Sequence, residues 1–105
     1  MVRGEVFGLR APRGTRGSEQ RGGRFAVVVQ ADELLPLSTV LVSPTSASAP
    51  PRSFRPTVTI GGASTRVLVE QTTAISPERL GSSVGRLAAT ELRDLDAALA
   101  LVFGL

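Results

Sequence analysis

The segment GSEQRGGRFAVVVQ, residues 17–30, says most about the fold of this chain. Its first half, residues 17–24, holds three glycines, a carboxylate, a carboxamide and two guanidiniums, a composition typical of a loop. Its second half runs through Phe25 and Ala26 into three valines, and such an apolar run predicts a buried strand. A polar loop joined to a buried strand holds its charged groups at the rim of a domain, where an anionic ligand can bind.

Further apolar segments lie on both sides of this strand. We expect strands at residues 5–9, 25–30, 39–42, 57–60 and 66–71, a helical turn at residues 31–35 and a hairpin turn at residues 61–62. Pro44 is expected to stop the third strand, because proline cannot donate to a sheet ladder. Residues 43–56 then form a long loop rich in serine and proline.

The C-terminal segment predicts one helix. Its apolar side chains recur at helical spacing, at Leu92, Leu95, Leu99, Val102 and Phe103. Thr90 is the expected N-cap, with Glu91 in the first turn, and Gly104 is placed to end the helix. The apolar stripe is expected to be core or subunit interface.

The length of 105 residues suits one domain with one core, over residues 1–105. Five short strands and one closing helix predict a mostly β (α+β) fold, a small, strongly bent antiparallel sheet or partly open barrel. Aromatic residues are few, with four Phe and no Trp or Tyr, so the core consists mainly of small aliphatic side chains. Such a lightly filled core favours a dimer.

The residue types that are absent restrict the chemistry. The chain has no Cys, His or Lys, so thiolate sites, the commonest general base and the commonest metal ligand are excluded. We expect no metal and no other cofactor. An enzyme built from this sequence works with carboxylates, hydroxyls, amides and guanidiniums.

All twelve basic residues are Arg, and they are unevenly distributed. Residues 1–30 carry six Arg against two Glu, whereas the rest of the chain is close to neutral. A local excess of Arg suits phosphate, because its planar fork donates two parallel hydrogen bonds. A solvated, solubilising loop is the alternative on charge alone.

Targeting signals are not evident in the sequence. The first residues lack the apolar stretch of a signal peptide, and no segment approaches the ~20 apolar residues of a membrane span. We expect a cytoplasmic protein with no membrane partner.

Several blocks in chain order resemble MazF/PemK-type toxins. The family's usual pattern is RG-acid-V-aromatic, a downstream Pro, GSEQ with a following Arg, V-x-P-x-T, and VLLEQ followed by Ile and RLG. The matching blocks here are RGEVF at residues 3–7, Pro12, GSEQ at 17–20 with Arg24, VSPTS at 42–46, VLVEQ at 67–71, Ile75 and ERLG at 78–81. The resemblance spans nearly the whole chain.

The resemblance implies an SH3-like, strongly bent barrel of the Kid/MazF/CcdB type that forms a homodimer. It implies an endoribonuclease that cleaves single-stranded RNA (mRNA, tRNA or rRNA) at a short sequence without metal. The 2′-hydroxyl attacks the phosphate, and the products are a 2′,3′-cyclic phosphate and a 5′-hydroxyl. A cognate MazE-like antitoxin counters the growth arrest that such a toxin causes.

The resemblance also implies site residues. Arg24 matches the family's catalytic Arg, and Ser46 stands where the family has its catalytic Thr. Glu19 matches the loop Glu suspected as the base, and Glu70, the acid of the acid-Gln pair, is the second candidate for that role. Leu68 stands where some members place an Arg. The residues expected to bind RNA are Arg13, Arg16, Gln20, Arg21, Thr45 and Gln71.

Alternatives remain for single residues and for the whole protein. Glu19 can equally pair with Arg21 or Arg24 and order the loop, and Ser46 can be a turn residue. The same barrel also serves CcdB-like toxins, which poison gyrase without nuclease chemistry. The departures from the family pattern at residues 8–11 and at Phe25, which replaces the usual Pro, keep open an inactive homologue that only binds an antitoxin.

Overall fold

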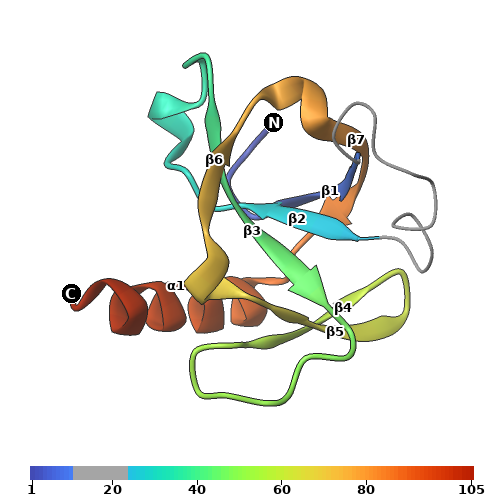
Figure 1. Cartoon of the computed structure of the whole chain (residues 1–105), viewed down its shortest axis with the longest axis vertical. Helices are drawn as coiled ribbons and strands as arrows, with labels where there is room; N and C mark the ends of the chain where they lie inside the picture. The colour runs from blue at the N-terminus through green and yellow to red at the C-terminus, as the bar shows by residue number, and fades with distance from the viewer. Residues whose placement is uncertain (11–23) are drawn as a thin grey trace.

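The computed structural model describes residues 1–10 and 24–105 and shows one curled antiparallel sheet with a single α-helix beside it (Figure 1). The strands run in the order β4-β5-β3-β2-β1-β7, and β6 pairs with β3 off this path. The elements are β1 (Glu5–Leu9), β2 (Phe25–Val28), β3 (Val40–Ser46), β4 (Thr57–Ile60), β5 (Ala63–Val67), β6 (Thr73–Ile75), β7 (Leu80–Arg86) and α1 (Ala89–Phe103), with 3-10 turns η2 (Asp32–Leu34), η3 (Val69–Gln71) and η4 (Pro77–Arg79). The expected bent sheet with a closing helix is therefore confirmed.

Strand β2 explains the apolar run that follows the loop. Val27 is buried against β4, β5 and α1, whereas Ala26 and Val28 are buried in a second cluster with β3, Ile75 and Leu80. A strand buried on both faces needs apolar side chains at every position. The strand ends at Val28, earlier than expected.

Gln30, expected inside that strand, instead ties the following turn to β3. Its amide nitrogen donates to the Leu34 carbonyl at 2.6 Å, and its amide oxygen accepts from the Leu41 backbone N–H at 2.9 Å. The expected helical turn is present as η2.

Strand β3 continues through Pro44, so the prediction that this proline stops the strand was wrong. Residues 42–44 pair with β2, and on the other side the partner changes from β6, at residues 40–42, to β5, at residues 45–46. The Pro44 carbonyl accepts from the Leu68 N–H at 2.8 Å, so its backbone polar groups face this second side. The missing N–H therefore falls where one partner strand has ended and the next begins.

The strand predicted at residues 66–71 begins and ends earlier, as β5. Gly61 and Gly62 both have positive φ, 59° and 83°, so they make a two-residue turn and β5 starts at once at Ala63. Residues 69–71 form the turn η3 instead of the strand end that we expected.

The strands β6 and β7 were not predicted from the sequence. β6 has only three residues, and β7, with the sequence LGSSVGR, is exposed along most of its length and lacks apolar alternation. A Cβ on Gly81 would lie 3.2 Å from the Gly8 carbonyl oxygen, a tight contact with backbone, so glycine favours the close approach of β7 to β1 there. Before it, the Arg79 guanidinium donates to the Arg10 carbonyl at 2.9 and 3.2 Å. The ERLG block thus joins η4 and β7 to the end of β1.

Helix α1 starts after Ala88, so Thr90 is not its N-cap. Glu91 closes the start of the helix, because its carboxylate accepts a hydrogen bond from the Ala88 N–H at 2.8 Å. The same carboxylate accepts from the Thr59 N–H of β4 at 2.8 Å, which ties the helix to the sheet. Gly104 ends the helix in the left-handed conformation, with φ 72°, as predicted. In the described part of the chain, no helix is long and apolar enough to cross a membrane.

Candidate active site

A pocket of about 510 Å³ opens where β2 begins, β3 ends and the β4–β5 hairpin folds toward them. In Figure 1 the start of β2 and this hairpin lie on the same side of the molecule. The pocket, which we call the Arg24–Ser46 pocket, is lined by Arg24, Phe25, Thr45, Ser46, Ala47, Ser48, Ile60, Ala63, Ser64 and Thr65. Among the described residues, its polar side chains are hydroxyls and the Arg24 guanidinium.

The sheet register explains why Arg24 and Ser46 line one pocket. β2 and β3 are antiparallel, with Ala26 opposite Pro44. If the register is extended by two residues beyond this last pair, Arg24 comes opposite Ser46, and directly opposite side chains share a face of the sheet. The expectation that these two residues face a common pocket is met, while their catalytic roles stay predictions.

The backbone around the two residues is held on both sides. The Arg24 carbonyl accepts from the Leu9 N–H of β1 at 2.9 Å, and the Arg24 side chain is exposed. Ser46 pairs with Arg66 of β5, and its hydroxyl lies 3.4 Å from that of Ser48. A guanidinium and a hydroxyl carried on such an ordered backbone can together bind an oxyanion.

Thr45 was expected to bind RNA, and it also lines the Arg24–Ser46 pocket. Its side chain is nearly fully buried, with 3% of the residue exposed. The expected loop residues Arg13, Arg16, Glu19, Gln20 and Arg21 lie outside the described residues.

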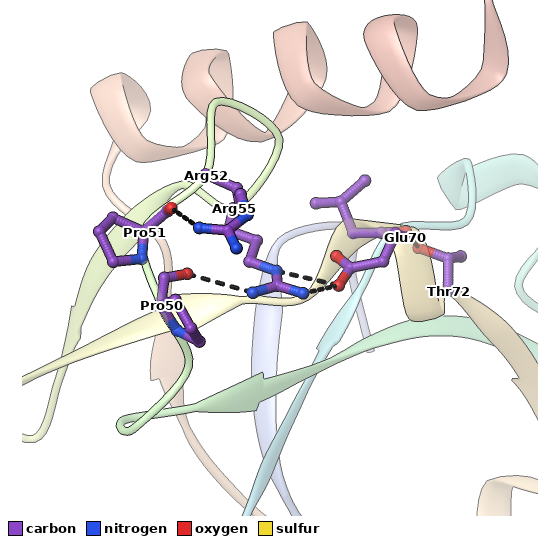
Figure 2. A network of polar contacts seen from close by, with 7 residues as sticks. Pro50, Pro51, Arg52, Arg55, Glu70 and Thr72 are labelled. Carbon is purple, nitrogen blue, oxygen red and sulfur yellow. Dashed lines mark hydrogen bonds and ion pairs between the residues drawn. The ribbon is translucent and has the colours of Figure 1, made fainter.

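Glu70 and Gln71 do not line this pocket. Both lie on η3, and the Glu70 carboxylate is paired with Arg55, as Figure 2 shows. The Nε and Nη2 atoms of Arg55 donate to the same Glu70 oxygen at 2.9 and 2.6 Å. These bonds hold the pKa of the Glu70 carboxyl below its ordinary value, against the opposite effect of partial burial. A carboxylate with a lowered pKa is a weaker proton acceptor.

The sequence alone did not predict Arg55 as the partner of Glu70. Leu68 gave the one indication, because it stands where some family members have an Arg and so leaves Glu70 without that neighbouring cation. The sequence holds no further signal, because residues 55 and 70 meet only through the path of the loop after β3. Ser64 and Thr65 of the hairpin were missed for the same reason.

The described residues also bear on metal binding. Among residues 1–10 and 24–105, no three acidic side chains cluster as a metal ion would need. The described residues bring a guanidinium and hydroxyls to the Arg24–Ser46 pocket.

The fold and the pocket define a small, curled half-barrel protein with one closing helix and a polar site at the end of its central strands. Residues 2–103 match the family described as PemK-like, MazF-like toxin of type II toxin-antitoxin system. The chain therefore belongs to this toxin family.

Comparisons with individual proteins agree. A candidate toxin of Mycobacterium tuberculosis is 38% identical over 106 residues, which cover 100% of this chain and 99% of that protein. Among solved structures, an endoribonuclease in complex with its cognate antitoxin from a mycobacterial species superposes with a TM-score of 0.81 at 14% identity, covering 100% of this chain and 96% of the other. The Mycobacterium tuberculosis toxin MazF-mt6 gives a TM-score of 0.77 at 18% identity, covering 96% and 97%. A MazE–MazF structure from Deinococcus radiodurans gives 0.77 at 17% identity, covering 100% and 96%. These structural likenesses describe the fold.

Proposed function

We propose that this protein is a toxin endoribonuclease that cleaves single-stranded RNA at a short sequence without a metal ion. The observation that carries the proposal is the shared pocket of Arg24 and Ser46, in a chain that belongs to the MazF-like toxin family. Two solved structures of the same fold are endoribonucleases, which supports this activity at the level of the family.

The reaction needs no nucleophile from the protein, because RNA supplies its own. The 2′-oxygen attacks the adjacent phosphorus, the bond to the 5′-oxygen breaks, and the products are a 2′,3′-cyclic phosphate and a 5′-hydroxyl. Arg24 binds the scissile phosphate and stabilises the charge that develops on its oxygens. The Ser46 hydroxyl donates a hydrogen bond to one of these oxygens.

Two proton transfers complete the balance of the reaction. One base accepts the 2′-hydroxyl proton, and the leaving 5′-oxygen takes a proton from water. Glu19 is our candidate for the base, and this assignment rests on the family resemblance. A guanidinium stays protonated in proteins, so Arg24 acts by its charge more readily than by donating a proton.

We further propose two protein partners. A second copy of the chain would cover an apolar groove of about 670 Å³ between α1 and the strands β3 and β6. We call it the apolar groove; it includes Leu41, Leu99, Phe103 and Leu105, of which Leu41, Phe103 and Leu105 are 42%, 59% and 94% exposed. Exposed apolar side chains gathered in one groove favour association. A MazE-like antitoxin is the second partner, in line with complexes of the same fold.

The test is to incubate the purified protein with RNA in EDTA and to map the new ends. Cleavage with 5′-hydroxyl and 2′,3′-cyclic phosphate ends is the expected result. Intact RNA together with inhibition of gyrase would contradict the proposal and favour a CcdB-like toxin. Intact RNA with antitoxin binding alone would also contradict it and indicate an inactive homologue.

A further inference from the structure

The segment that follows Ser46 is held by two guanidiniums. Ala47 and Ser48 line the Arg24–Ser46 pocket, and the next two residues offer their carbonyls to arginine side chains. Arg66 donates from Nη1 to the Ala49 carbonyl at 3.2 Å, and Arg55 donates from Nη1 to the Pro50 carbonyl at 3.1 Å. The two residues that directly follow the pocket wall are therefore each held by an arginine side chain.

Arg55 is itself fixed by Glu70. Figure 2 shows its guanidinium between the Pro50 carbonyl on one side and the Glu70 carboxylate on the other. The Arg55 and Glu70 side chains are only 19% and 27% exposed, and the guanidinium lies 5.6 Å from the centre of the Phe54 ring. Hydrogen bonds between charged groups are stronger than neutral ones, so Glu70 gives Arg55 one preferred orientation.

The composition of the segment explains why such contacts are useful. Residues 47–56 include three prolines, Pro50, Pro51 and Pro56, which lack the N–H that a backbone ladder requires. Backbone N–H groups bond the Arg52 and Pro56 carbonyls, whereas the carbonyls of Ala49 and Pro50, the part nearest the pocket, accept from arginine side chains. Arg55 reaches both the segment and η3, which packs next to β3.

We propose that Arg55 and Glu70 form a clamp that positions the pocket wall after Ser46, and that Glu70 acts through this clamp rather than as the base. This proposal rests on the proposed function, whose RNA substrate the pocket would bind. Arg55 and Glu70 are positioning residues: neither lines the Arg24–Ser46 pocket, and they act by fixing the place of Ser46 and Ser48. A misplaced hydroxyl would lower the turnover number more than it would weaken binding of RNA.

A double-mutant cycle separates a clamp from a base. We expect R55Q and E70Q each to lower kcat about 10-fold with little change in KM, because a misplaced group of this kind costs up to about 100-fold. The double variant should lose no more than either single one, since each breaks the same contact. The pH profile of kcat should keep its shape in E70Q. The control is E33Q, which removes an exposed carboxylate on η2.

Three results would overturn the clamp. The first is a loss in E70Q of about 100-fold or more, the range for a general base, with a lost limb of the pH profile and near-normal R55Q. The second is normal cleavage by both single variants. The third is a fall in thermal stability in both variants with unchanged kcat, which would mean a structural role alone.

Amide hydrogen exchange without RNA tests the clamp independently of activity. We expect faster exchange at residues 46–48 in R55Q and E70Q, and no change in E33Q. Unchanged exchange in both clamp variants would overturn the clamp even if the protein cleaves no RNA. Absence of RNA cleavage by the unaltered protein would refute the proposed function only.

Discussion

The Arg24–Ser46 pocket and the apolar groove use opposite ends of the same strand. The last residues of β3, Thr45 and Ser46, line the pocket, whereas Leu41, near its start, lines the groove. The pocket gathers hydroxyls and a guanidinium where strands end, and the groove gathers exposed apolar side chains along α1. One strand thus carries the candidate site at one end and an exposed apolar groove at the other.

Helix α1 shows the same division within one apolar stripe. Leu95 is fully buried in the core, whereas Phe103, two turns later, is 59% exposed and lines the groove. The stripe that the sequence predicted as core or interface is core in its first half and open in its second. This difference can be tested by shortening each side chain.

The largest expected effect is on stability at the core end of the stripe. Leu95→Ala should lower the free energy of unfolding by about 2–5 kcal/mol, because it leaves a cavity against the sheet. Phe103→Ala should cost less than about 1 kcal/mol when the monomer is studied, because its side chain is already mostly in water. Urea unfolding of both variants at low protein concentration checks this. Equal losses would contradict the division of the helix.

The next effect concerns the pocket. Ser46→Ala should lower RNA cleavage about 10- to 100-fold, the cost of losing one hydrogen bond to a charged group. Ser46→Thr keeps the hydroxyl and should retain most of the activity. The measurement is the cleavage rate of a labelled RNA in EDTA. Full activity of Ser46→Ala would remove this hydroxyl from the mechanism.

A charge in the groove should act on association and leave the pocket unchanged. Phe103→Glu should shift a dimer to monomer, because it places a carboxylate in the apolar groove. Light scattering after gel filtration measures the mass. Val84→Glu, on exposed β7 and outside the groove, is the matched control. A dimer that persists in Phe103→Glu would place the interface elsewhere.

The smallest effect is the pH dependence that Glu70 contributes. Arg55 lowers the pKa of this carboxyl in the folded protein, so its contribution to stability is present above the ordinary pKa of Glu and is lost as pH falls through the lowered one. At pH 7, Glu70→Gln should cost about 1 kcal/mol or less. Below about pH 4.3 the difference from the unaltered protein should shrink. Urea unfolding from pH 7 to pH 3 checks this, and a difference that stays constant with pH would contradict the pairing.

The sequence predicted those parts of the fold that depend on local patterns. The valine run of β2, the Gly61-Gly62 turn and the Gly104 helix end all follow from the preferences of nearby residues. β7 was missed because its pairing with β1 depends on the distant contact between Gly81 and Gly8, and its side chains show no alternation. The prediction for Pro44 was wrong because a proline is accepted in a strand where no partner needs its N–H, and that depends on which strands pair on either side.

The candidate site shows the same limit. Arg24 and Ser46 could be proposed together from the resemblance, and a continuous strand register explains why they share a pocket. The pairing of Arg55 with Glu70 could not be predicted, because it depends on how a proline-rich segment returns to η3. Local patterns predict elements, whereas contacts between loops require the structure.

The proposed reaction depends most on the action of Arg24 on the phosphate of RNA. The most direct test compares Arg24→Ala with Arg93→Ala, an exposed arginine on α1 outside the pocket, on the same RNA in EDTA. We expect Arg24→Ala to lose about 100-fold or more in cleavage rate, with unchanged unfolding, while Arg93→Ala keeps full activity. Cleavage by Arg24→Ala at the rate of the unaltered protein would contradict the account.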